Sequence, residues 1–238
     1  MKTESILKRI LFAGVAGAAL CLPSVGQAGN LGSSVPIFGD PVTISYLGID
    51  TATAAGVFGG ATFNGAPIPD FWCIDITHTV PYPPWVLGNY SQATFQSAPL
   101  SFTATQVSNL ETLFFNNYSA SLFTSTDNAA AFQLAIWDVL FDSDGNLATY
   151  GNPPSTFGVV SGASGALALA QAWINIAENP AHQHIFSLVQ LTSSAGNQAF
   201  VYPNPRGQEA PEPAPLALLG AGLVAMLFVT RRRRTDTA

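Results

Sequence analysis

Cys73 is the first residue whose type and position suggest chemistry. It lies in the segment Phe-Trp-Cys-Ile-Asp, residues 71–75, and the only other cysteine, Cys21, lies near the N-terminus. Cys21 falls within residues 1–28, which have the pattern of a secretory signal peptide described below, so Cys73 is the one cysteine expected in the mature chain. Exported proteins usually pair their cysteines in disulfides, so this single thiol needs an explanation. Four explanations stay open: a buried inert thiol, an intermolecular disulfide, a catalytic nucleophile, or a side chain consumed in another covalent bond.

The residues around Cys73 alternate in polarity, which predicts a strand over residues 71–78. The two sets of side chains are Trp72, Ile74 and Ile76 on one face and Cys73, Asp75 and Thr77 on the other. Cys73 shares its face with a carboxylate and a hydroxyl, which argues against an inert core thiol. His78 falls on the opposite face and is expected to point away, so a Cys-His hydrolase has no local signature.

Gln133 is the second candidate, in a helix predicted over residues 128–141. Residues 125–127 are Ser-Thr-Asp, which cap helix N-termini well. The helix has an apolar stripe made of Phe132, Ala135, Ile136, Val139 and Leu140. Gln133 lies in its first turns and Trp137 follows one turn later. The plain interpretation of Gln133 is a polar residue at the edge of the helix, facing water.

Taken together, Phe-Trp-Cys-Ile-Asp and Phe-Gln-Leu-Ala-Ile-Trp resemble the thioester domains of bacterial surface adhesins. The resemblance implies that Cys73 supplies a thiol and Gln133 an acyl group, and that the two condense with loss of ammonia into an internal thioester. Attack by a target amine or hydroxyl on the Gln133 carbonyl then expels the Cys73 thiolate and leaves a covalent link. Trp137 would shield the bond. Asp75, on the face of Cys73, would orient the site or activate the nucleophile.

The composition of the chain between its two ends agrees with a protected acyl group. Residues 29–210 contain no lysine, whose amine would attack a stored thioester. They hold eleven Asp and Glu residues and a single arginine, Arg206, which gives a formal charge of −10. Such a negative surface repels nucleic acid and anionic lipid, so we exclude both as partners.

The N-terminus has the pattern of a secretory signal peptide, residues 1–28. Lys2, Lys8 and Arg9 precede an apolar stretch over residues 11–22, and small residues lead to a cleavage site after Ala28. The apolar stretch is shorter than the roughly 20 residues of a membrane span.

The C-terminus, residues 207–238, has three parts: a Pro-Glu-Pro tripeptide, an apolar run over residues 216–229, and a basic cluster. The residues concerned are Pro211, Glu212 and Pro213, then Arg231, Arg232, Arg233 and Arg234. This tail resembles the PEP-CTERM sorting signal of Gram-negative exported proteins. The resemblance implies exosortase as a partner, cleavage near the tripeptide and transient insertion into the inner membrane. It further implies a final location at the cell surface or in the extracellular polysaccharide of a biofilm matrix.

One α+β domain, residues 29–206, is predicted between these ends, with strands at both ends and about three helices inserted. The expected strands are residues 41–47, 56–64, 71–78, 184–191 and 198–202, and the expected helices are 105–118, 128–141 and 164–179. Residues 150–160 are expected to form a loop around Pro153 and Pro154.

Asp142, Asp144 and Asn146 place oxygen ligands at alternate positions beside a turn glycine, as calcium loops do. The full EF-hand pattern is absent, and a turn that ends a helix uses the same residues. Calcium is the one cofactor that the sequence suggests.

The function that these observations predict is single-use covalent attachment to a surface or matrix nucleophile through a Cys73–Gln133 thioester, not enzymatic turnover. The alternative is a non-covalent structural or polysaccharide-binding matrix protein with a free thiol at Cys73. Tyr82, Trp85 and Tyr90, spaced by prolines, would then stack on sugars if they are exposed, or cover the core if they are not.

Overall fold

The computed structural model describes residues 27–33, 38–78, 86–95, 102–142, 144–147, 156–193 and 197–204. The predicted sorting signal and nearly all of the predicted signal peptide lie outside these residues, as do Tyr82 and Trp85. Within the described part of the chain, no helix is long and apolar enough to cross a membrane.

The fold is α+β, as the sequence predicts. Its strands are β1 (Gln27–Ser33), β2 (Phe38–Tyr46), β3 (Ile49–Val57), β4 (Ala61–Phe63), β5 (Ala66–Pro67), β6 (Trp72–Cys73), β7 (Val86–Thr94), β8 (Phe157–Gly162), β9 (Leu188–Ser193) and β10 (Phe200–Pro203). Its helices are α2 (Ala104–Asn117), α3 (Thr126–Phe141) and α4 (Ser164–Ala177), with short 3-10 turns η2 (Ala120–Phe123) and η3 (Pro180–His182).

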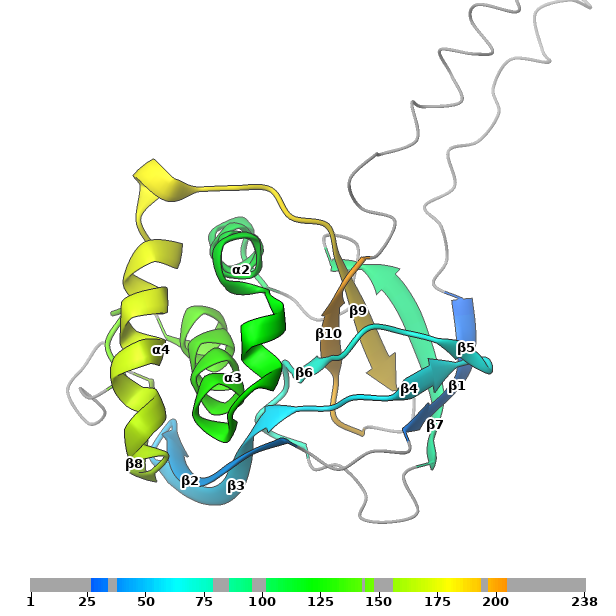
Figure 1. The fold of residues 1–238 in the computed structure, drawn as a ribbon, viewed down its shortest axis with the longest axis horizontal. Coiled ribbons are helices and arrows are strands. Elements are labelled where there is room, and N and C mark those ends of the chain that lie inside the picture. Colours follow the sequence, from blue (N-terminus) through cyan, green and yellow to red (C-terminus); the bar gives the residue numbers. More distant parts are fainter. Residues whose placement is uncertain are drawn as a thin grey trace, which may run out of the picture.

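The strands form two antiparallel sheets (Figure 1). The larger sheet has the order β5-β4-β1-β7-β9-β10-β6, and the smaller one has the order β3-β2-β8. Figure 1 shows the three helices grouped above the smaller sheet, with β6 lying between α3 and the rest of the larger sheet. β6 is therefore the strand of the larger sheet that meets the helices.

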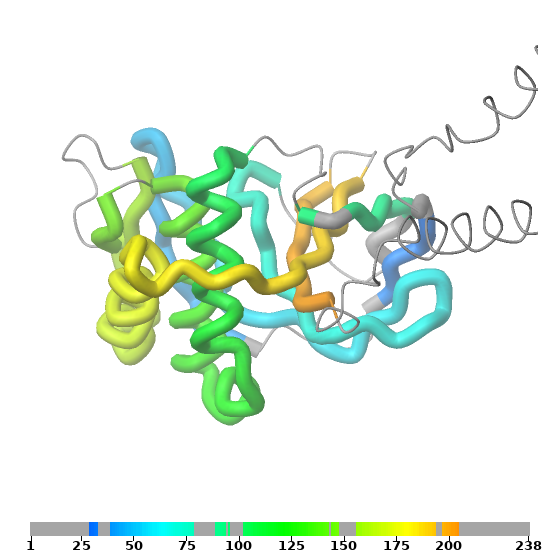
Figure 2. Tube along the Cα trace, turned by 90° about the horizontal axis from the view of Figure 1, so that it is seen from above, coloured from blue at the N-terminus to red at the C-terminus, as the bar shows by residue number. Residues whose placement is uncertain are grey.

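The core centres on α3. Its residues 129–140 are all buried, because the helix packs on β2 and β3 on one side and on α2 and α4 on others. Ser125 caps its N-terminus by accepting the Asn128 N–H at 3.1 Å. The segment between η3 and β9 passes across α2 (Figures 1 and 2), where the Thr112 hydroxyl accepts the His184 N–H at 2.9 Å.

Four predictions of local structure are wrong. Residues 56–64 are not one strand, since β3 ends at Val57 and β4 covers only Ala61–Phe63, and residues 184–187 precede β9 rather than belonging to it. Residues 157–162 form strand β8 rather than a loop, because Asp142 accepts the backbone N–H of Phe157 and β2 pairs with the strand. The strand predicted over residues 71–78 ends at Cys73, because the Asp75 carboxylate accepts the N–H groups of Thr77 and His78 and bends the chain.

Candidate functional site

Cys73 lies on an edge strand whose outer side faces away from the sheet. On its inner side β6 pairs with β10, with Cys73 opposite Phe200. On its outer side, Phe71 and Phe58 exchange two backbone hydrogen bonds of 2.9 Å. Because backbone groups two residues apart in a strand point the same way, the N–H and C=O of Cys73 also point outward. They need partners, since Cys73 is buried.

The side chain of Gln133 supplies both partners. The Cys73 N–H donates to Gln133 Oε1 at 2.9 Å, and Gln133 Nε2 donates to the Cys73 carbonyl at 2.7 Å. The Gln133 amide thus makes the two hydrogen bonds that the backbone of a paired strand would make to Cys73. Gln133 is completely buried, so its interpretation as a polar residue facing water is wrong. The structure brings together the two residues that the sequence separates by 60 positions.

The aromatic neighbours of the pair hold it in register. Trp72, which precedes Cys73, packs edge-on against Phe132, which precedes Gln133, with ring centroids 5.0 Å apart. Phe114 of α2 contacts both rings, at 5.6 Å and 4.9 Å. Edge-to-face contacts of this kind stabilise by about 1 kcal/mol each beyond the area they bury. Sliding β6 along α3 would break both contacts of Trp72, so packing fixes the Cys73–Gln133 register.

The environment of Cys73 favours the protonated thiol. Burial raises the pKa of the Cys73 thiol well above its ordinary value, and the nearby Asp75 carboxylate raises it further. A buried thiol that stays protonated is a poor nucleophile for enzymatic turnover. It is also a poor leaving group, because a thiolate of high pKa is expelled slowly. Burial therefore disfavours the Cys73 thiolate both as an attacking group and as a departing group.

Asp75 lies beside the pair and is also buried, and its carboxylate has four hydrogen-bond donors. Oδ1 accepts the Thr77 N–H at 2.9 Å, the Thr77 hydroxyl at 2.7 Å and the His78 N–H at 3.2 Å. Oδ2 accepts from His78 Nδ1 at 2.6 Å. The prediction that His78 and Asp75 lie on opposite faces is therefore wrong. It assumed a strand that continues to residue 78, whereas the chain turns at Asp75.

Trp137 lies one helical turn after Gln133 and is buried. Its ring meets Phe157 of β8, with centroids 6.3 Å apart, and its Nε1 has no hydrogen-bond partner. It belongs to the packing between α3 and the smaller sheet. A shielding role for Trp137 stays a prediction.

Tyr90 is buried, which leaves it no surface for stacking on a sugar. Its hydroxyl donates to the Gln198 carbonyl at 2.8 Å, and the Gln198 side chain donates to the Asp75 carbonyl at 2.7 Å. Burial raises the pKa of Tyr90, and so do Cys73 and Asp75, which lie close to it. No sequence pattern predicted this support, because Tyr90 and Gln198 come near Asp75 only in the folded sheet.

The proposed calcium ligands serve the backbone of their own loop. Asp142 accepts the N–H groups of Asp144, Thr156 and Phe157 at 2.9–3.1 Å, and Asp144 accepts the Asn146 N–H at 2.9 Å. Among the described residues, no three His, Cys, Asp or Glu side chains are grouped as a metal site requires. Calcium binding stays a prediction.

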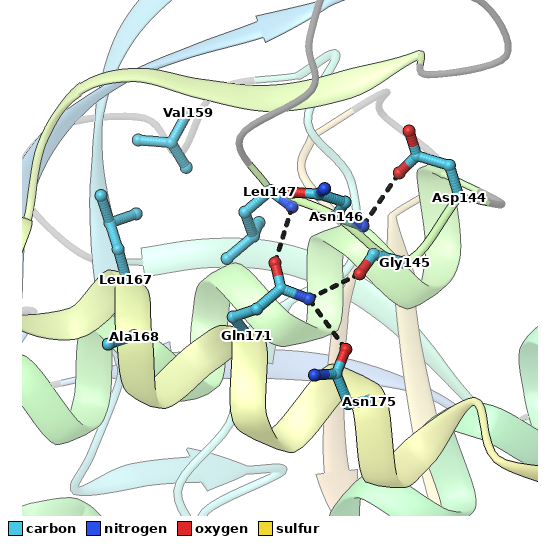
Figure 3. Close-up of a pocket in the computed structure, with 9 residues that line it drawn as sticks. All are labelled: Asp144, Gly145, Asn146, Leu147, Val159, Leu167, Ala168, Gln171 and Asn175. Atoms are coloured by element: carbon cyan, nitrogen blue, oxygen red, sulfur yellow. Dashed lines mark hydrogen bonds between the residues drawn. The ribbon is translucent and has the colours of Figure 1, made fainter.

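A surface pocket of about 570 Å³ lies next to this loop (Figure 3). Gln171 of α4 reaches across it, accepting the Leu147 N–H at 3.1 Å and donating to the Gly145 carbonyl at 2.6 Å and to Asn175 Oδ1 at 3.0 Å. The residues that line the pocket do not include Cys73 or Gln133. The pocket therefore does not open onto the candidate site.

Comparison with known proteins finds little that is close. No protein-family model matches the chain, and no curated protein matches it. Among solved structures, the chain is similar to the N-terminal thioester domain of fibronectin-binding protein SfbI from Streptococcus pyogenes. The identity is 14%, the TM-score is 0.39, and the match covers 71% of this chain and 97% of that one. A similarity this distant carries no function across, so the chemistry of the site rests on its own geometry.

Proposed function

We propose that Cys73 and Gln133 form an internal thioester, and that the exported chain uses it once to attach covalently to an amine or hydroxyl of a surface or matrix target. The observation that carries the proposal is the pair of hydrogen bonds between the Gln133 amide and the backbone of Cys73. These bonds hold the Gln133 carboxamide against the backbone of Cys73, whose thiol is the only one among the described residues.

The atoms of the site account for each step of bond formation. The Cys73 sulfur attacks Cδ of Gln133, the thiol proton passes to Nε2, and Nε2 leaves as ammonia. The Cys73 N–H, 2.9 Å from Oε1, donates to the oxygen on which negative charge develops. A fixed N–H donor in a dry site is the arrangement that stabilises the intermediates of acyl transfer. The same donor serves when a target nucleophile later attacks the thioester.

The surroundings support storage of the bond. Both residues are buried, which limits hydrolysis, and residues 29–210 contain no lysine to consume the acyl group. The predicted sorting signal completes the proposal. Exosortase would recognise the tail after transient insertion into the inner membrane, and the mature chain would act at the cell surface or in the extracellular polysaccharide matrix. The reaction is single-use and is not enzymatic turnover.

The thioester is tested by the intact mass of the exported chain, purified without reducing agent or amine buffers. We expect a mass lower by one ammonia than the sequence predicts, and a cross-linked peptide that contains Cys73 and Gln133. Methylamine should then add to Gln133 and release a thiol at Cys73 that reacts with maleimide once the protein is unfolded.

Methylamine opening should also lower the melting temperature. The thioester closes a loop of 60 residues, and the chain-entropy relation for disulfides gives such a cross-link about 4 kcal/mol. A chain of unmodified mass, with a thiol that titrates before any methylamine is added, would contradict the thioester. Gln133 would then act only to close the outer edge of β6 by hydrogen bonding.

A further inference from the structure

An aspartate–histidine pair lies at the end of β6, immediately after Cys73. His78 Nδ1 is 2.6 Å from Asp75 Oδ2, while Asp75 Oδ1 holds the backbone N–H groups of Thr77 and His78. A carboxylate oxygen accepts hydrogen bonds, and Nδ1 also lies 3.1 Å from the Thr77 hydroxyl, so we assign the ring proton to Nδ1. Nε2 is then the nitrogen with a lone pair to accept a proton.

Exposure to solvent increases along the chain from Cys73 through Asp75 to His78. The side chain of Asp75 is 11% exposed and that of His78 is 51% exposed, whereas Cys73 and Gln133 are buried. Asp75 follows Cys73 by two residues, so the carboxylate that holds His78 belongs to the same short segment as the thiol. The bend at Asp75 therefore places an oriented imidazole at the exposed end of the segment that begins at Cys73.

The contact between Asp75 and the His78 imidazole is not required to form the bend. The two backbone contacts of Asp75 Oδ1 form the turn, and the Thr77 hydroxyl reinforces it. The contact between Oδ2 and His78 Nδ1 adds no backbone constraint. Its effect is to fix the tautomer and direction of the imidazole, which is how carboxylates prepare histidines to act as bases.

We propose that His78, oriented by Asp75, accepts the proton of the amine or hydroxyl that attacks the thioester; this inference rests on the proposed Cys73–Gln133 bond. The lone pair of the nucleophile attacks Cδ of Gln133 while its proton moves to His78 Nε2. The bond between Cδ and the Cys73 sulfur breaks, and the departing thiolate takes up the proton from the imidazolium. The products are an amide or ester at Gln133, a thiol at Cys73 and neutral His78.

The test is the rate of methylamine incorporation by the full exported chain, followed by intact mass at one pH and one methylamine concentration. His78→Asn keeps an amide N–H near the position of Nδ1, so it preserves the contact with Asp75 and deletes Nε2. We expect this variant to lose ammonia as the wild type does, but to take up methylamine about 100-fold more slowly, the usual contribution of a general base. Free imidazole in solution should restore part of the lost rate.

His182→Asn is the matched control, because His182 is an exposed imidazole on η3. It should react at the wild-type rate. An unchanged rate in His78→Asn overturns the inference and leaves the thioester intact. A slower rate that free imidazole does not restore also overturns the inference, and a lower melting temperature in the same variant would assign His78 a structural role.

A wild-type chain of unmodified mass removes the thioester itself, and with it this role for His78. Should His78→Asn not fold, His78→Gln replaces it, since the Gln amide reaches the position of Nε2 without accepting a proton at neutral pH.

Discussion

Gln133→Ala is expected to give a chain of full calculated mass that takes up no methylamine and carries a free thiol at Cys73. The substitution removes the acyl group, so no ammonia can be lost. It also removes both hydrogen bonds to the Cys73 backbone. We therefore expect the variant to be less stable than Cys73→Ala, which lacks the thioester as well but keeps the Gln133 amide in place.

The expected difference between these two variants follows from the cost of unpaired buried groups. A buried backbone N–H or C=O without a partner costs about 1–3 kcal/mol, so losing partners for both gives roughly 2–6 kcal/mol in the free energy of unfolding. Urea unfolding of Gln133→Ala and Cys73→Ala measures it. Equal stabilities would mean that the two hydrogen bonds do not hold the edge of β6.

Gln190→Ala is the matched control for the chemistry. Gln190 on β9 is as fully buried as Gln133, and neither polar atom of its side chain has a hydrogen-bond partner. If burial alone made a glutamine able to form the thioester, Gln190 and Gln133 would react equally well. Only Gln133 lies against Cys73, so Gln190→Ala should still lose ammonia and take up methylamine. A full calculated mass for Gln190→Ala would contradict the assignment of the acyl group.

The sequence predicted the helices well because their signals are local. Thr103 and Ser125 cap α2 and α3 as their residue types suggest, and the periodic apolar positions follow within a few turns. The Cys73–Gln133 contact was predicted from two short motifs and a resemblance, not from periodicity. Its geometry depends on the packing of Trp72 against Phe132. Neither segment alone predicts that these two rings are in contact.

What the sequence did not predict depends on contacts between distant segments. β8 is a strand because β2 is beside it, and the preceding prolines favoured a loop. The polarity of residues 71–78 alternates as in a strand, yet the Asp75 carboxylate competes successfully for the backbone and ends it. His78 was excluded for this reason.

Asp138 on α3 differs from Asp75 in its hydrogen bonding, since the Asp75 carboxylate accepts four hydrogen bonds. It is completely buried, and neither of its oxygens has a hydrogen-bond partner. Burial raises the pKa of Asp138 to about 8, with further contributions from the charges of Glu178, Asp142 and Asp144. The folded chain therefore holds a proton on Asp138 at neutral pH that the unfolded chain releases near pH 4.

The sign of the resulting pH dependence is fixed by proton binding. Because the folded state binds more protons than the unfolded state between pH ~4 and ~8, the free energy of unfolding falls as pH rises through that window. The contribution of Asp138 is fully present below its unfolded pKa and is lost as pH rises through its folded pKa. The slope from this one group approaches about 1.4 kcal/mol per pH unit.

Asp138→Asn should remove this slope, because an amide stays neutral throughout. Relative to the wild type, its free energy of unfolding should rise by about 3 kcal/mol between pH ~5 and ~7, measured by urea unfolding at both values. Asp40→Asn is the control, since Asp40 lies partly exposed on β2 and should leave the wild-type slope unchanged. Parallel pH profiles for the wild type and Asp138→Asn would show that Asp138 ionises in the folded chain with little cost. Its carboxylate would then have a partner or a path to water within α3 and its neighbours.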